Sequence, residues 1–287
     1  VKPIMGMAGL ESGLVTPETT VPDPGWYRLP GDSRRYRDWI LRIRGTGHAP
    51  RVDLKMAIAE SCDVYFYDLA RRLTIDRMYD YLYPYGFGDR TGVDTTSERP
   101  GVLPSTRWKR EALAQAWYPG ETLSAGIGQG YVLATPMQLA MATSVLASKG
   151  ERRTPRLLKA IDGEPVVAPP LEPIIADEAN WESVYDGMRE VVHGKRGTAK
   201  KLSKGIAYEM AGKTGTAQVI GIAQNAVYNE DEVAERHRHH GLFIAFAPLE
   251  APTIAVAIIV ENGGGSSAAS PIARQVIDTW LLGEEAG

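Results

Sequence analysis

The sequence Lys213-Thr214-Gly215-Thr216 combines a cation, two hydroxyl groups and a glycine in a segment whose composition is typical of a β-strand. From one strand, the lysine and the threonine hydroxyls can bind a carboxylate through charge-assisted hydrogen bonds. Gly215 lets a ligand backbone approach closely. A lone sequence of this kind is more often an ordinary solvated strand edge. By itself it therefore leaves both interpretations open.

A second polar pair, Ser61 and Asp63, lies in or near a predicted helix, well before that strand in the chain. A hydroxyl and a carboxylate two positions apart can both face a cleft from a turn. The alternative is that both side chains lie on the polar surface of a helix. Taken alone, the pair favours this alternative. The interpretation of this pair therefore depends on the rest of the chain.

Four residues in the first part of the chain have side chains that zinc commonly binds, namely Asp23, Asp38, His48 and Cys62. Four such ligands complete a structural zinc site. Their spacings match no compact zinc motif, and spacing alone favours an acid-rich loop beside a small core cysteine. His48 is nevertheless the only histidine before His193.

A run of three histidines follows the lysine–threonine–glycine segment, in the sequence AERHRHHG. His237, His239 and His240 could also bind a metal. The surrounding charges favour a solvated connection instead.

Helical patterns occur in four segments of the chain. Thr135 is a suitable N-cap, Pro136 suits the first helical position, and Gly194 ends the third segment. Ile272, Val276, Ile277 and Trp280 are expected on one apolar face of the fourth. The four segments are Asp53–Leu73, Thr135–Ser148, Asp177–His193 and Ala268–Leu282.

The carboxyl-terminal third of the chain has the alternation of strands, while Ile161–Pro173 reads as a strand end and a loop. Helices followed by strands and a closing helix indicate an α+β fold, in which helices pack on an antiparallel sheet. We expect a helical subdomain at roughly 50–160 and a sheet portion mainly at 205–287. The predicted strands are Tyr208–Val219, Gly241–Pro248 and Pro252–Glu261.

Bulk composition excludes several classes of protein. The chain has 287 residues, 44% of them hydrophobic, which is enough for a sizeable core in one large or two small domains. The net charge of -3 and the absence of a basic run argue against a nucleic-acid partner. With one cysteine, no intrachain disulfide can form. No apolar run reaches the roughly 18–20 residues that span a bilayer.

Longer stretches of the sequence resemble the class B penicillin-binding proteins. They extend over nearly the whole chain and include VKPIMGMAGLESG, DPGWYRLPG, RYRDW, SCDVYFYDLA, GIGQGYVLATPMQLAMA, KTGTAQ, FIAFAP and ENGG. Of these, DPGWYRLPG, SCDVYFYDLA and KTGTAQ are most similar to the elongation-type penicillin-binding protein 2 of Gram-negative bacteria. The family carries three motifs, S-x-x-K, S-D-N and K-T-G. Lys2, Ser61 and Lys213 match one residue of each.

This resemblance implies the fold of penicillin-binding transpeptidases and serine β-lactamases, and a D,D-transpeptidase that cross-links stem peptides ending in D-Ala-D-Ala and is acylated by β-lactams. Lys2 would take the proton of the nucleophilic serine, and Ser61 would relay a proton to the leaving group. Lys213 and Thr214 would bind the substrate carboxylate, and the N–H of Thr216 would serve the oxyanion. Asp63 would hold the second motif in shape.

The sequence departs from the family pattern in two ways. Counting back from Lys2 puts the nucleophilic serine two residues before Val1, so we expect residues 1–287 to be a transpeptidase domain without its amino-terminal part that is not acylated as it stands. The second motif ends in Asp63, where most of the family has asparagine. An ionised aspartate cannot donate a hydrogen bond to substrate.

The resemblance also implies a structural zinc, because the Gram-negative members bind zinc beside the active site through two aspartates, a histidine and a cysteine. Asp23, Asp38 and Cys62 match that pattern in order, with His48 as the histidine. It further implies an inner-membrane anchor, a periplasmic catalytic domain and a SEDS-family glycosyltransferase partner in the intact protein. Two other functions stay open: a related carboxypeptidase or β-lactamase, and a non-catalytic β-lactam-sensing module.

Overall fold

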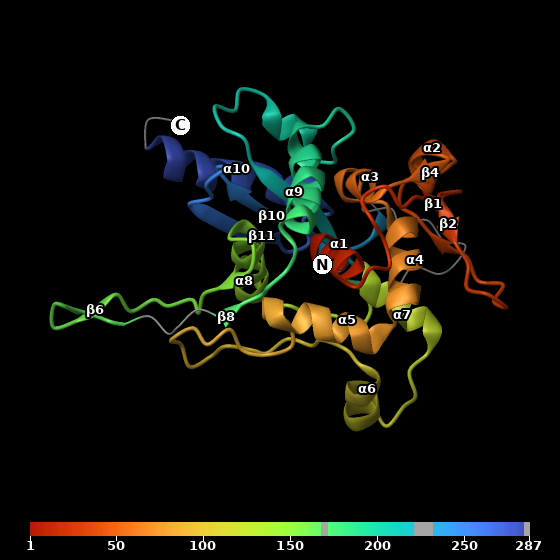
Figure 1. Ribbon diagram of the computed structural model, residues 1–287, viewed down its shortest axis with the longest axis horizontal. Helices are drawn as coiled ribbons and strands as arrows, with labels where there is room; N and C mark the ends of the chain where they lie inside the picture. Colours follow the sequence, from red (N-terminus) through yellow and green to blue (C-terminus); the bar gives the residue numbers. More distant parts are fainter. Residues whose placement is uncertain (168–171, 221–231, 284–287) are drawn as a thin grey trace.

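The computed structural model describes residues 1–167, 172–220 and 232–283, which form an α+β fold with helices around an antiparallel sheet, as predicted (Figure 1). The helices are α1 (Lys2–Glu11), α2 (Leu41–Arg44), α3 (Leu54–Ala59), α4 (Asp63–Leu73), α5 (Ile75–Leu82), α6 (Thr106–Leu113), α7 (Pro119–Gly126), α8 (Pro136–Ala147), α9 (Glu178–His193) and α10 (Ser266–Leu282). The strands are β1 (Val21–Pro22), β2 (Trp26–Tyr27), β3 (Tyr36–Arg37), β4 (Arg51–Val52), β5 (Glu151–Arg152), β6 (Ala160–Ile161), β7 (Glu164–Pro165), β8 (Glu172–Pro173), β9 (Ala211–Ala217), β10 (His240–Ala247) and β11 (Ile254–Val260).

The main sheet consists of β9, β10 and β11 in the order β11-β10-β9, with antiparallel neighbours. The predicted meander is confirmed, although β9 is shorter than the segment expected at 208–219. The central strand β10 buries Phe243, Ala245 and Phe246. Lys213 of β9 pairs with Ile244, and Thr214 pairs with Phe243. The buried central strand therefore fixes the position of the lysine–threonine–glycine segment.

Helices α8, α9 and α10 all contact this sheet. The amino-terminal helix α1 lies in the middle of the molecule, in contact with α4, α5 and α9 (Figure 1). Residues Lys2 to Leu10 of α1 are all buried. A helix buried on every side is held by packing rather than by an amphipathic pattern, so Lys2 enters the active-site region from a rigid support.

The single helix expected at 53–73 is wrong, because the structure breaks it into α3 and α4. Ser61 lies between them with a φ of 59°, in the left-handed region that a non-glycine residue rarely adopts. Asp53 caps α3 by accepting the N–H of Met56 at 2.8 Å, and Cys62 caps α4 by accepting that of Tyr65 at 3.5 Å. Because of this break, Ser61 lies in a turn and not on the surface of a helix.

The prediction that Ile272, Val276, Ile277 and Trp280 lie on one apolar face of the closing helix is also wrong in part. Of its large apolar residues only Ile277 is fully buried, beside Ala269 and Ala273, whereas Ile272 and Trp280 are 42% and 64% exposed. Small residues let α10 lie close against the sheet, and this turns the larger side chains outward.

The helices expected at 135–148 and 177–193 are confirmed as α8 and α9. Thr135 and Gln138 form a capping box at the start of α8, and Asp177 caps α9 through the N–H of Ala179. The segment read as a strand end and loop contains the end of β6, its hairpin partner β7, and β8, which pairs with the earlier strand β5. Residues 168–171 of this segment lie outside the described residues. Among the described helices, none has both the length and the apolar composition needed to cross a bilayer.

Candidate active site and metal centre

An open cleft with a volume of about 1400 Å³ lies between α1, the α3–α4 turn and β9. Every residue that the sequence suggested for acyl transfer lines this cleft. They are Lys2, Ser61, Asp63, Lys213, Thr214, Gly215 and Thr216. The structure therefore brings together three segments that are far apart in the chain.

Lys2 lies at the centre of this group. Its Nζ donates to Ser61 Oγ at 3.0 Å, to the Ser61 carbonyl oxygen at 2.7 Å and to Asp63 Oδ1 at 2.6 Å. Burial raises the pKa of Asp63 above its ordinary value, although the charge of Lys2 opposes this. The raised pKa means that Asp63 takes up a proton more readily here than it would in water.

The position of Lys2 follows from how α1 packs. Pro3 stands in the first turn, where a missing N–H costs no helical hydrogen bond. Gly9 has no room for a side chain, since a Cβ there would lie 2.9 Å from Val15 Cγ2 and 3.0 Å from Leu69. Close packing on the buried side of α4 therefore sets the start of α1 beside the α3–α4 turn.

The turn that carries Ser61 is held by its own carbonyl oxygen. This oxygen accepts from Lys2 Nζ and also from Nε1 of Trp39, at 3.1 Å. Two donors on one carbonyl stabilise the unfavourable backbone conformation at Ser61. Trp39 also lines the cleft. It belongs to the RYRDW stretch already noted for its resemblance, although the sequence assigned it no role of its own.

Lys213 is buried and lines the same cleft from β9. Its Nζ donates to the Thr214 carbonyl oxygen at 3.0 Å. Burial, followed by the nearby charge of Lys2, lowers the pKa of Lys213 well below its ordinary value. An anion bound beside this amine would favour its charged form, so the site is suited to a carboxylate ligand.

Two further polar side chains contact β9 from other elements. Thr198 Oγ1 lies 2.8 Å from Thr214 Oγ1, and Gln129 Nε2 donates to the Thr216 carbonyl oxygen at 2.6 Å. Both residues line the cleft. Gln129 belongs to the GIGQG stretch already noted for its resemblance, whereas Thr198 carried no signal of its own in the sequence.

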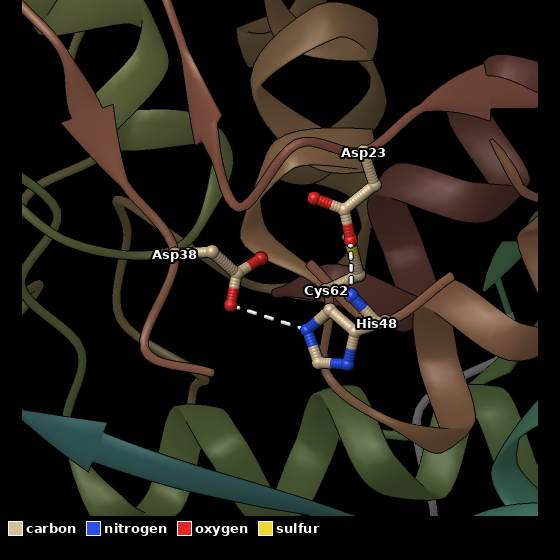
Figure 2. A group of neighbouring side chains, drawn as sticks. All are labelled: Asp23, Asp38, His48 and Cys62. Carbon is tan, nitrogen blue, oxygen red and sulfur yellow. Dashed lines mark hydrogen bonds and ion pairs between the residues drawn. The ribbon is translucent and has the colours of Figure 1, made fainter. Parts of the chain in front are cut away.

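Behind the cleft, Asp23, Asp38, His48 and Cys62 form one buried cluster (Figure 2). One potential ligand atom from each lies within 4.8 Å of the others. His48 Nε2 is 3.1 Å from Asp38 Oδ1, and Cys62 Sγ is 3.5 Å from Asp23 Oδ2. Zinc bonds of about 2.0–2.3 Å at tetrahedral angles hold ligand atoms roughly 3.3–3.7 Å apart, which is close to these two distances.

The electrostatics of the cluster favour a cation. Burial alone would lower the pKa of His48, but its hydrogen bond to Asp38 and the charge of that carboxylate outweigh burial and raise the pKa. Burial, followed by the charges of Asp38 and Asp23, raises the pKa of the Cys62 thiol well above its ordinary value. A sulfur, a nitrogen and two carboxylates are a donor set that zinc binds. The residues therefore fit a structural zinc.

Glu60 is an additional buried acid that the sequence did not single out. Its Oε2 lies 3.4 Å from His48 Nδ1, which leaves Nε2 toward the other three residues of the cluster. Arg196 holds the same carboxylate at 2.8 Å and also donates to the His48 carbonyl oxygen. A carboxylate on the outer nitrogen is the usual way to orient a metal-binding histidine.

The histidines after β9 do not form a second cluster, since the described residues contain only the group above. His237 is exposed, as a solvated connection predicts. For His239 that prediction is wrong, because it is only 5% exposed and its Nδ1 accepts the N–H of Val219. His240 opens β10 and accepts the N–H of Asn262. The start of a central strand places both beside the cleft.

Comparisons with known proteins agree with this geometry. Residues 1–278 match the family described as the penicillin binding protein transpeptidase domain. The chain is 41% identical over 289 residues to peptidoglycan D,D-transpeptidase MrdA of Escherichia coli strain K12, covering 99% of this chain and 45% of that protein. It thus spans less than half the length of this relative.

Solved structures show the same similarity. Pseudomonas aeruginosa PBP2 in complex with WCK 5153 superposes with a TM-score of 0.87 at 48% identity, over 99% of this chain and 60% of that one. PBP2 from Helicobacter pylori, in a complex with MreC, gives a TM-score of 0.83 at 34% identity, over 99% of this chain and 49% of that one. With the convergent cleft, these matches show that the chain belongs to the penicillin-binding protein transpeptidase domain family.

Proposed function

We propose that this chain supplies most of the active site of a peptidoglycan D,D-transpeptidase, which cross-links stem peptides through a serine acyl-enzyme. The observation that carries the proposal is the position of Lys2 Nζ, which contacts both Ser61 Oγ and Asp63 in the same cleft as Lys213. The relatives are longer than this chain, so the proposal concerns the whole protein. Its nucleophile is the serine expected two residues before Val1.

In the acylation step, the serine oxygen attacks the penultimate D-Ala carbonyl carbon, and its proton passes to neutral Lys2. The close contact between Lys2 and Asp63 supports access to the neutral amine, because the buried carboxylate can take up a proton. Collapse of the tetrahedral intermediate breaks the peptide bond. Ser61 then relays a proton to the leaving amine of the terminal D-Ala.

Lys213 and Thr214 bind the terminal carboxylate of the donor peptide, or that of a β-lactam. The backbone N–H of Thr216 and that of the nucleophilic serine stabilise the oxyanion. An amine from a neighbouring stem peptide then attacks the ester carbonyl, forms the new amide and releases the serine with its proton restored. The test is D-Ala release and amide formation by the full-length protein on a D-Ala-D-Ala peptide with an added amine.

Among the described residues, no glutamate lines the cleft. Class A β-lactamases use a glutamate near the site to deacylate. This favours transpeptidation over β-lactam hydrolysis. A long-lived penicillin adduct on the full-length protein distinguishes the two, since a β-lactamase would release it quickly.

We further propose that Asp23, Asp38, His48 and Cys62 hold one zinc ion as a structural site. All four side chains are buried, and the segment from Asp23 to His48 contains only two-residue strands and the short helix α2. Such a segment has little regular structure of its own, and a metal would supply order there. Metal analysis of purified protein tests the proposal, with one zinc per chain as the expected result.

In the intact protein, we infer an inner-membrane anchor, a periplasmic catalytic domain and a partner of the SEDS glycosyltransferase family. The complex of Helicobacter pylori PBP2 with MreC supports a place in a multiprotein assembly. The resemblance of the sequence to the elongation-type penicillin-binding protein 2 supports a role during cell elongation. Co-purification of the full-length protein with a membrane glycosyltransferase tests the partnership.

A further inference from the structure

One wall of the cleft is unusually basic. Arg34, Arg35, Arg37 and Arg42 all line it, and all four are exposed. Among the described residues, and with Lys2 and Lys213 included, the lining holds six lysines and arginines against two carboxylates, although the whole chain carries a net charge of -3. Positive charge is therefore concentrated at the cleft.

The two carboxylates of the lining are already engaged inside the protein. Asp63 pairs with Lys2, and Asp38 contacts His48 and the first N–H groups of α4. Neither is available to neutralise the arginines. Of the described residues, none forms a salt bridge with Arg34, Arg35 or Arg37, whereas Arg71 and Arg72 nearby in the structure both pair with Asp68.

Two of these arginines are held in place by aromatic rings of the β2–β3 hairpin. The guanidinium carbon of Arg35 lies 4.5 Å from the ring centre of Trp26, and that of Arg34 lies 4.9 Å from the ring centre of Tyr36. The hairpin register pairs Trp26 with Arg37, so the third arginine belongs to the same hairpin. Stacking covers one face of a guanidinium and leaves its N–H edge for an anion.

We propose that Arg34, Arg35 and Arg37 form an arginine wall that binds a second carboxylate of the peptide substrate, distinct from the terminal carboxylate assigned to Lys213. The substrate is then an acidic peptide that carries at least one carboxylate besides its carboxyl terminus. This inference rests on the proposed function. A guanidinium group that stacks on an aromatic ring and forms no salt bridge with the described residues, as in Arg34 and Arg35, is suited to bidentate binding of a carboxylate.

The test compares two D-Ala-D-Ala peptides that differ only in whether their internal carboxylates are free or amidated. Full-length protein and its Arg34→Gln, Arg35→Gln and Arg37→Gln variants are assayed for kcat/KM on both. We expect the parent to prefer the free acid and each variant to lose about three- to tenfold of that preference. Arg28→Gln is the matched control, because Arg28 is exposed next to the same hairpin but does not line the cleft. It should keep the full preference.

Two further readouts complete the test. Protein with the nucleophile replaced by alanine should bind the free-acid peptide more tightly than the amidated one, without any reaction. This result tests the arginine wall even if the proposed chemistry fails. Separate rates of acylation and of transfer to an amine show which peptide carries the bound carboxylate. An effect on acylation alone places it on the donor, and one on transfer alone places it on the acceptor. The proposal would be overturned if the variants lost kcat/KM equally on both peptides, or if their preference for the free acid did not change.

Discussion

Asp38 and Asp63 connect the candidate metal centre to the cleft. Asp38 Oδ2 accepts the backbone N–H of Asp63 at 2.6 Å, while Asp38 Oδ1 lies 3.1 Å from His48 Nε2. Asp63 in turn pairs with Lys2. One carboxylate thus caps the helix that presents the second motif and also belongs to the buried cluster. Order in the cluster and order in the active site are therefore coupled.

Removing zinc should destabilise the protein and slow acylation together. At a free zinc concentration 1,000 times Kd, loss of the metal costs about 4 kcal/mol, which corresponds to a fall in Tm on the order of 10 °C. We expect a chelator, Cys62→Ser and His48→Ala each to have this effect in thermal melts. His237→Ala is the control, since His237 is exposed and outside the cluster. If a chelator left the melting curve unchanged, Asp23 and Asp38 would be ordinary loop residues and not metal ligands.

Zinc binding should release protons and weaken as the pH falls. Burial raises the pKa of the Cys62 thiol well above its ordinary value, and the contact with Asp38 raises the pKa of His48 against the opposing effect of burial. Both must lose protons to bind the metal, so protons compete with zinc at low pH. Titration calorimetry in buffers of different ionisation enthalpy should show about one to two protons released at pH 7. Cys62→Ser should lower this by about one, and heats independent of buffer would contradict the assignment.

Glu60 should set metal affinity through His48. We expect Glu60→Gln to weaken zinc binding about ten- to hundredfold in a chelator competition, because the amide holds His48 Nδ1 and Arg196 less strongly than the carboxylate does. Glu111→Gln, at an exposed position on α6, is the control. If Glu60→Gln bound zinc as tightly as the parent, its contact with His48 would be of no consequence for the metal.

Lys213→Ala should slow acylation by penicillin about ten- to hundredfold, the effect of losing a charge-assisted hydrogen bond of about 1.5–3 kcal/mol. Its effect on Tm should be small. The lowered pKa of Lys213 shows that burial disfavours its charge, and removing that cost offsets the lost contact with Thr214. Lys204→Ala, at an exposed position, controls for loss of charge. Equal acylation rates in mutant and parent would remove Lys213 from the carboxylate site.

The sequence predicted the parts of the fold and site that depend on local pattern. The strand around Lys213 and the helix starting at Pro136 follow from alternation, periodicity and capping residues within one segment. The cluster of Asp23, Asp38, His48 and Cys62 was expected only through a family resemblance, since its spacings indicate nothing. The structure places these four side chains together, while their role as zinc ligands stays a prediction.

What the sequence could not supply depends on contacts between distant segments. Arg196 reaches Glu60 and His48 from the far end of α9, and no local pattern encodes that approach. The break before α4 depends on the left-handed backbone at Ser61, which Lys2 and Trp39 stabilise from outside the segment. Which face of α10 points outward depends on how closely the helix packs against the sheet. In each case tertiary packing decides between local alternatives.

The central claim is that Lys2, Ser61 and Lys213 form the site of a serine acyl-enzyme, and intact-protein mass spectrometry after incubation with benzylpenicillin tests it most directly. Residues 1–287 alone should show no adduct. The same chain preceded by Ser-Thr should gain the mass of one penicillin, and peptide mapping should place it on the added serine. An adduct on the chain without that serine, or none on the full-length protein, would contradict the account.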